Sequence, residues 1–173
     1  ELGHFALILA FLVAIAQTVA PLAGAHRGNR AWMAVAEPAA FAQLLLVGFA
    51  FAVLTIAFVT SDFSVTLVVN NSHTDKPLLY KFSGVWGNHE GSMLLWVMIL
   101  ALYGALAAYC GGNLPAALRA RVLGVPGAIG VALLGFILFT SNPFPRVLHP
   151  PLNGQDLHPP LTAPAPSVLP DTK

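Results

Sequence analysis

The chain has 173 residues, of which 57% are hydrophobic and 9% are charged, and its formal net charge is +1. Soluble domains carry about 25% charged residues, so this composition excludes an ordinary soluble domain and indicates an integral membrane protein. The nearly neutral charge gives no indication of a nucleic-acid partner. Cys110 is the only cysteine, which excludes an intrachain disulfide and a Cys-x-x-Cys motif.

Four apolar stretches are long enough to cross a bilayer as helices, which takes about 20 residues. They cover residues 2–23, 38–60, 92–110 and 122–140, and none has a Lys or Arg in its interior. The sequence therefore predicts an all-α integral membrane fold, with one four-helix transmembrane region over residues 1–141. The predicted fourth helix would place Pro126 in its first turn, where a missing N–H group costs little.

The first stretch has an alternative interpretation as a cleaved signal peptide. Ala23-Gly24-Ala25 resembles a signal-peptidase site, but the residues that precede the apolar run carry no positive charge. The stretch is therefore interpreted as a membrane span. Its residues Ala6, Ala10 and Ala14 form a ladder of small side chains, and Gly124, Ala128 and Ala132 form another in the fourth stretch, a pattern typical of closely packed helices in lipid.

The distribution of positive charge predicts the orientation in the membrane. Four arginines lie in the first and third connections, whereas three cations lie on the opposite side within about 20 residues of a span: Arg27, Arg30, Arg119 and Arg121 against Lys76, Lys81 and Arg146. By the positive-inside rule, the first and third connections face the cytoplasm. The N-terminus, the connection 61–91 and the tail 142–173 would then lie on the outer, periplasmic face.

The connection 61–91 contains several local patterns. Residues 65–69 are β-prone, residues 70–72 are typical of a turn, and residues 78–82 form an amphipathic segment with aromatic side chains. We expect this connection to lie on the membrane surface, with its aromatic rings in the interfacial belt. Within the spans, Gln17, Gln43 and Thr55 are interpreted as interhelical hydrogen-bond partners rather than substrate ligands.

The polar motif Trp86–Trp96, at the start of the third span, is the main candidate functional element. Asn88 is predicted to cap the helix, with Glu90 in the first turn beside the positive end of the helix dipole. The spacing places His89, Ser92, Met93 and Trp96 on one face. His89 could bind a metal, accept a proton or serve as a hydrogen-bonding anchor, and the sequence leaves these roles open. The remaining motif residues, Gly87 and Gly91, are assigned a supporting role.

No catalytic constellation is found in the sequence. Paired carboxylates, a His-Glu-x-x-His helix, a Gly-rich phosphate loop and a serine elbow are all missing. The residues Gly111-Gly112-Asn113 followed by Leu114-Pro115 are typical of a helix stop and turn. The residues themselves therefore indicate no enzyme class.

Four separated blocks nevertheless resemble one family. They are Glu1-Leu2-Gly3-His4-Phe5-Ala6-Leu7, Phe58-Val59-Thr60-Ser61-Asp62-Phe63-Ser64-Val65, Trp86-Gly87-Asn88-His89-Glu90-Gly91-Ser92 and Thr140-Ser141-Asn142-Pro143-Phe144. In this order they resemble the N-terminal part of the CcmF family, the large inner-membrane subunits of the bacterial cytochrome c maturation haem lyase, with the related nitrite-reductase assembly proteins. The resemblance extends over residues 1 to about 157.

The resemblance implies a role in cytochrome c biogenesis at the bacterial inner membrane. Family members resemble a machine that receives haem from a haem-carrying chaperone and attaches it to apocytochrome c together with other maturation subunits. The implied cofactor is haem, including a b-type haem within the helices, and membrane lipid is a further partner. The rival hypothesis is a small haem-independent membrane scaffold or transporter subunit.

The chain also departs from the family pattern. Family members are several times longer, and their Trp-rich haem segment and b-haem histidines follow the point at which this chain ends. The tail after residue 157 is rich in proline and is expected to be disordered or frameshifted. Without the Trp-rich haem segment, this chain alone is not expected to form thioether bonds. His158 either occupies the family's His-Pro-Pro haem-ligand position after a deletion or matches it by coincidence, and His149-Pro150-Pro151 resembles the same element.

Overall fold

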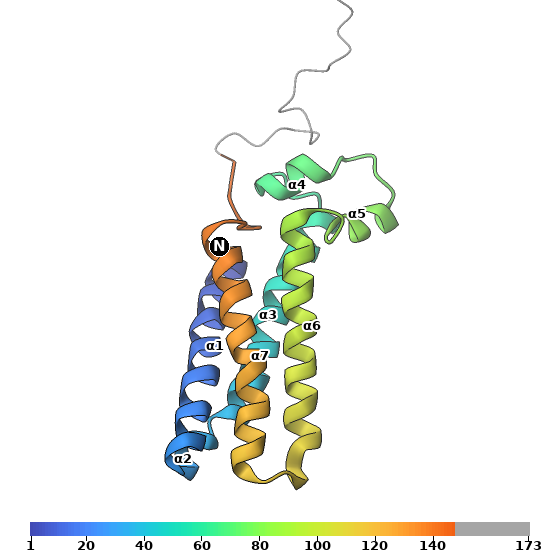
Figure 1. Ribbon diagram of the computed structural model, residues 1–173. Helices are drawn as coiled ribbons and strands as arrows, with labels where there is room; N and C mark the ends of the chain where they lie inside the picture. Colours follow the sequence, from blue (N-terminus) through green and yellow to red (C-terminus); the bar gives the residue numbers. More distant parts are fainter. Residues whose placement is uncertain (148–173) are drawn as a thin grey trace, which may run out of the picture.

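The computed structural model describes residues 1–147. The regular elements in this part of the chain are helices joined by turns and loops (Figure 1). The elements in chain order are α1 (Leu2–Arg27), α2 (Arg30–Met33), α3 (Ala36–Val59), α4 (Thr66–Asn71), α5 (Leu78–Gly84), α6 (His89–Cys110), a 3-10 turn (Gly111–Asn113) and α7 (Ala116–Phe139). No strand is found within residues 1–147, where a single antiparallel bridge pairs Val65 with Arg146. The predictions for His149, His158 and most of the Pro-rich tail lie outside the described residues.

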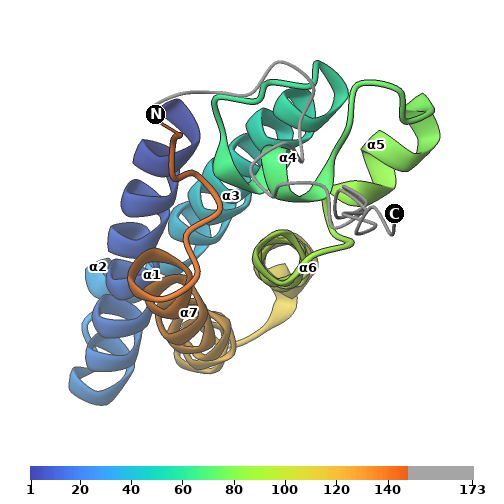
Figure 2. The same ribbon diagram turned by 90° about the horizontal axis from the view of Figure 1, so that it is seen from above.

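Four long helices, α1, α3, α6 and α7, run side by side as one bundle (Figures 1 and 2). Each is long and apolar enough to cross a membrane, with a mean hydropathy of 2.1 to 2.4 over its most apolar window. Around the bundle, α1 lies between α3 and α7, and α6 closes the ring by contacting both α3 and α7. The predicted all-α fold with four helices that can span a membrane is therefore confirmed.

Small residues allow α1 to approach its neighbours closely. Ala6, Ala10 and Ala14 are buried at 4%, 0% and 0% exposure, so the predicted ladder in α1 is confirmed. In α7 the prediction was only partly right, because Gly124 is buried whereas Ala128 and Ala132 are exposed. The buried small residues of α7 instead continue through Gly127 and Gly130, as the 3.6-residue period of a helix requires.

Helix α7 begins earlier than the hydropathy predicts. It starts at Ala116, so Pro126 lies in its interior and the predicted position in the first turn is wrong. The hydropathy signal began only after Arg121, because two arginines precede the apolar run. Arg119 is accommodated in the helix because its guanidinium contacts Glu37 of α3 at 2.9 Å and the backbone oxygen of Ala108 in α6 at 2.6 Å.

The connection between α3 and α6 folds over one end of the bundle (Figure 1). We call this the capped end, and we call the opposite end, with Arg27, Arg30, Arg119 and Arg121, the arginine end. The β-prone stretch forms a single bridge residue, Val65, followed by helix α4, so the expected extended structure is wrong. The apolar side chains of Leu67, Val68 and Val69 are buried, and tertiary packing has overridden the β propensity of these residues.

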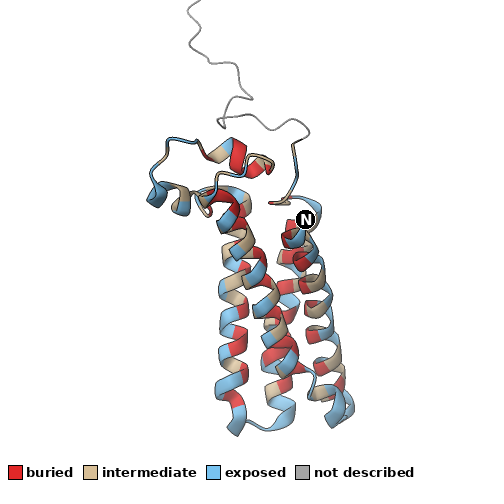
Figure 3. Ribbon diagram, turned by 180° about the vertical axis from the view of Figure 1, so that it is seen from behind, coloured by how far each residue is buried: buried red, intermediate tan, exposed pale blue. Residues whose placement is uncertain are grey.

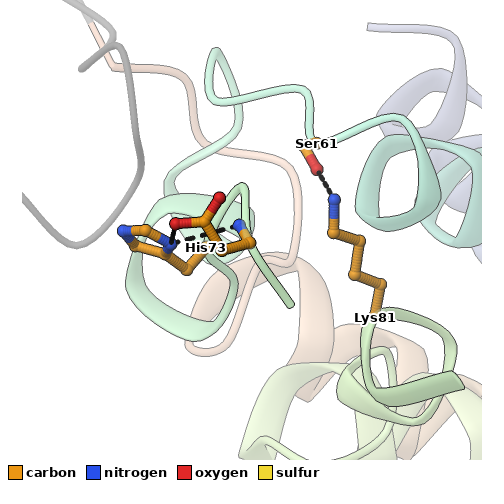
Figure 4. A network of polar contacts seen from close by, with 4 residues as sticks. Ser61, His73 and Lys81 are labelled. Atoms are coloured by element: carbon orange, nitrogen blue, oxygen red, sulfur yellow. Dashed lines mark hydrogen bonds and ion pairs between the residues drawn. The ribbon is translucent and has the colours of Figure 1, made fainter. Parts of the chain in front are cut away.

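The C-terminus of α3 is tied to this cap. Ser61 has a positive φ of 55°, and the N–H group of Asp62 donates to the backbone oxygen of Ala57 at 2.8 Å, which is the Schellman pattern of a helix end. The Nζ of Lys81 in α5 donates to the Ser61 Oγ at 2.7 Å (Figure 4). This contact joins the end of α3 to α5 and places a cation near the negative end of the helix dipole. Beside it, His73 Nδ1 lies 3.7 Å from an Asp75 carboxylate oxygen.

Candidate functional site at the capped end

Asn88 is the structural centre of the Trp86–Trp96 motif. Its Oδ1 accepts a hydrogen bond from the N–H group of Gly91 at 2.7 Å, so the predicted N-cap of the helix is confirmed. Its Nδ2 donates to the backbone oxygens of Gly84 at 2.8 Å and Val85 at 3.3 Å. One amide side chain therefore satisfies an unpaired N–H group at the start of α6 and two backbone oxygens at the end of α5.

Gly91 is required by the same turn. A methyl group built at this position would overlap the backbone oxygen of Val85, which lies against the α-carbon. Gly87 differs, because a methyl group there would lie 3.4 Å from the backbone oxygen of Ser83, which is ordinary contact. The two glycines of the motif therefore have different roles, and Gly91 alone is needed for a close approach between backbones.

The expected polar stripe on α6 lies on the outward side of the helix. Gly91, Leu94 and Val97 form the buried face, whereas His89 is exposed and Trp96 is 64% exposed. Ser92 is half-buried, and its hydroxyl donates to the backbone oxygen of His89 at 2.9 Å, within its own helix. Met93 is half-buried and packs against the core, so it departs from the stripe. His89 and Trp96 share an outward face, as the spacing predicted.

His89, at the start of α6, contacts α7 at the capped end. Its ring meets the Phe136 ring edge-on, with 6.2 Å between centroids. Further along the two helices an apolar groove of about 390 Å³ is present, with these lining residues: Trp96, Ile99, Leu100, Tyr103, Ile129 and Leu133. This arrangement combines an exposed imidazole with an apolar surface.

Trp86 anchors the motif to the core. Its ring packs edge-on against Phe82, with centroids 5.1 Å apart, and the side chain is half-buried against the main hydrophobic cluster. Glu90 is half-buried in the first turn of α6, where a carboxylate complements the helix dipole. Neither His89 nor Glu90 makes a hydrogen bond or ion pair through its side chain within residues 1–147.

A second polar cluster at this end joins the first block to the last block. His4 Nδ1 lies 3.1 Å from Asn142 Nδ2, and the Phe144 ring packs directly onto Gly3, where no side chain would fit. Sequence reasoning identified both blocks by resemblance but did not assign His4 or Asn142 to a site. The signal that could have found them is positional, because both residues lie just at the outer end of a predicted span.

Backbone contacts tie the second block to the last one. The N–H group of Thr66 donates to the backbone oxygen of Pro145 at 2.9 Å, and that of Val147 donates to the backbone oxygen of Ser64 at 3.0 Å. The third block joins through Asn88, whose Nδ2 donates to the backbone oxygen of Gly84, and Gly84 lies against the buried ring of Phe58 in the second block. All four resembling blocks therefore meet at the capped end, although they are up to about 140 residues apart in sequence.

The cofactor that the resemblance implies is haem, which would need imidazole or thiolate ligands at this end. The part of the chain that the structure describes contains no group of three His, Cys, Asp or Glu residues arranged to hold a metal. His89 meets the Phe136 ring, His4 meets Asn142 and His73 meets Asp75, so each of these three imidazoles lies against another kind of side chain and not against a second imidazole. Residues 1–147 therefore do not fit a closed bis-histidine haem site, and no chemical step is assigned to haem here.

The fold defines a multi-span helical membrane protein, and comparisons with known proteins give its family. The chain is 66% identical over 164 residues to the cytochrome c-type biogenesis protein ccl1 of Rhodobacter capsulatus, covering 95% of this chain and 25% of that protein. It is 49% identical over 160 residues to CcmF of Pseudomonas aeruginosa, covering 92% of this chain and 24% of that protein. The chain belongs to the CcmF family of cytochrome c-type biogenesis proteins.

A solved structure supports the same assignment. The structure titled "Cytochrome c Heme Lyase CcmF" superposes with a TM-score of 0.78 at 29% identity, covering 83% of this chain and 24% of that chain. The chain thus spans about a quarter of the length of the relatives that it matches. No family model matches the sequence.

Proposed function

We propose that this chain forms part of a haem lyase subunit of the bacterial inner membrane and acts in haem delivery and attachment to apocytochrome c. The observation that carries the proposal is the convergence of the four resembling blocks at the capped end of the bundle. Bundles do not need these polar and glycine residues to span a bilayer, because packing of small residues supplies the contacts between helices. Their placement at one end favours a shared task outside the lipid.

The proposed orientation places the capped end in the periplasm. The arginine end carries four cations in short connections, and the capped end carries Lys76, Lys81 and Arg146. The positive-inside rule favours the end with more Lys and Arg in short loops as the cytoplasmic one. Apocytochrome c, a haem-carrying chaperone and other maturation subunits would then meet the capped end from the outside.

Within this proposal the motif supports a haem site that other segments complete. Asn88 and Gly91 fix the angle between α5 and α6, and this holds Trp86 against the core and His89 beside Phe136 of α7. His89 is the one motif residue with a free imidazole, so it is the proposed contact for an incoming ligand or partner. His158 stays a candidate ligand by resemblance and lies outside the described residues.

A chimera tests the proposal. Residues 1–147 would replace the matching quarter of the Rhodobacter capsulatus relative, in a strain that lacks that protein, and c-type haem staining of membranes would be measured. We expect the chimera to restore staining, and we expect His89→Ala to reduce it while the chimera accumulates to the same level on an immunoblot. A chimera that accumulates in the membrane yet restores no staining would contradict the proposed role.

A further inference from the structure

Two glutamines from different helices line one cavity in the interior of the bundle. Gln17 of α1 is 2% exposed and Gln43 of α3 is 5% exposed. The other lining residues are small or apolar and come from α3, α6 and α7: Ala40, Val97, Leu100, Ala101, Gly104, Pro126 and Gly130. All four long helices contribute residues to this cavity. Its volume of about 10 Å³ is close to that needed for one water molecule.

Two side-chain oxygens at the cavity, the Oε1 atoms of Gln17 and Gln43, accept no hydrogen bond within residues 1–147. Gln17 Nε2 donates to the backbone oxygen of Leu123 in α7 at 3.0 Å, which fixes the amide with its Oε1 pointing elsewhere. The Oε1 atoms of Gln17 and Gln43 are both buried and have no donor within residues 1–147. Two unpaired acceptors therefore belong to residues that line the same cavity, and the Nε2 of Gln43 also makes no hydrogen bond within residues 1–147.

The hydroxyl group next to Gln17 is already used, because Thr18 Oγ1 donates to the backbone oxygen of Ala14 at 2.8 Å. Leaving an amide oxygen unpaired in the hydrocarbon region is costly, because lipid offers no donor. A water molecule needs about 10–15 Å³ of such space and 2–4 polar partners, and both conditions are met here.

We propose that Gln17 and Gln43 form a binding site for one water molecule in the membrane interior. The water donates one hydrogen bond to each Oε1 atom, while Gln17 Nε2 continues to hold α7 through Leu123. The site would thereby link α1, α3 and α7 by hydrogen bonds at the level of the proline in α7. This linkage is additional to the proposed function and does not depend on it.

The sign of a stability change tests this site. Gln43→Met keeps the length of the side chain and removes the amide, with its Oε1 acceptor and its Nε2 donor. If water bridges the two glutamines, the variant weakens the water site and strands the Gln17 oxygen, so the folding equilibrium constant of the full chain, measured by SDS titration in mixed micelles, falls about fivefold, the equivalent of one hydrogen bond. If the cavity is dry, the variant removes an unpaired acceptor and the constant rises, which would overturn the proposal.

Thr55→Val is the matched control, because Thr55 lies in the same helix and its hydroxyl bonds only to its own backbone. It tests whether any loss of a polar group from α3 has the same effect, and we expect a change of less than about twofold. A Thr55→Val effect as large as that of Gln43→Met would contradict an assignment of the loss to the water site.

A direct measurement uses the unaltered protein, and variants serve only to assign its signals. The sequence has three glutamines, so labelling glutamine side-chain carbonyls with ¹³C gives a small set of signals. In water-edited solid-state NMR of the protein in bilayers, the Gln17 and Gln43 carbonyls should receive magnetisation from water, and Gln43→Met and Gln17→Met assign them by loss of one signal. Absence of transfer to both carbonyls, or transfer between the two amides showing direct pairing, would overturn the proposal.

Discussion

At the scale of single residues, the two glycines of the motif allow a matched experiment. Gly91→Ala would force a methyl group into the Val85 carbonyl, so we expect it to destabilise the protein by about 2 kcal/mol or more. Gly87→Ala meets only ordinary contact and should change stability by less than about 0.5 kcal/mol. Thermal unfolding of the purified protein, followed by circular dichroism, measures both. Equal losses in the two variants would show that the close approach at Gly91 is not what constrains the motif.

At the scale of elements, Arg119 joins three helices at the arginine end. It lies in α7 and contacts Glu37 near the start of α3 and the backbone oxygen of Ala108 near the end of α6. Hydrogen bonds to charged groups contribute about 1.5–3 kcal/mol, and the half-exposed Glu37 lowers the share that comes from the ion pair. We expect Arg119→Ala to lower the unfolding free energy by about 1–2 kcal/mol, measured by SDS titration.

Arg121→Ala provides the control for this clamp. Arg121 lies two residues away on the same helix and is exposed, and its removal should change stability by less than about 0.5 kcal/mol. Because Arg119 also contacts a helix end, Arg119→Lys should recover only part of the loss: an ammonium lacks the planar fork that reaches both partners. Full recovery by lysine would mean that charge alone accounts for the contact.

At the scale of the whole molecule, the orientation can be tested with the single cysteine. Cys110 is exposed at the arginine end of α6. If that end faces the cytoplasm, a membrane-impermeant maleimide should not label Cys110 in intact spheroplasts but should label it after lysis. In a Cys110→Ser, Ser83→Cys variant, labelling of intact spheroplasts should succeed, because α5 lies at the capped end (Figure 1), where exposed residues lie beside buried ones (Figure 3). The reverse pattern would invert the proposed topology.

The long helices could be predicted from sequence because hydropathy and helical length are properties of contiguous residues. The N-cap by Asn88 was also predictable, since its partner is three residues away. The start of α7 was not, because Arg119 is accommodated by partners in two other helices that only the packed bundle brings near. The pairing of His4 with Asn142 is likewise a contact across 138 residues, and no local pattern specifies it. The helix at residues 66–71 was missed because burial of Leu67 and Val68 outweighs β propensity.

The pairing of residues 64–66 with residues 145–147 has a consequence for biosynthesis. These segments are about 80 residues apart, and a ribosome adds about 5–20 residues per second. The loop after α3 must therefore wait several seconds before its bridging partner is synthesised. During that interval α1 and α3 can associate through their small residues, whereas the capped end has no completed backbone pairing. Newly made chains that stall before residue 147 should thus be preferred substrates for membrane-associated proteases, which would remove partial bundles whose four blocks have not met.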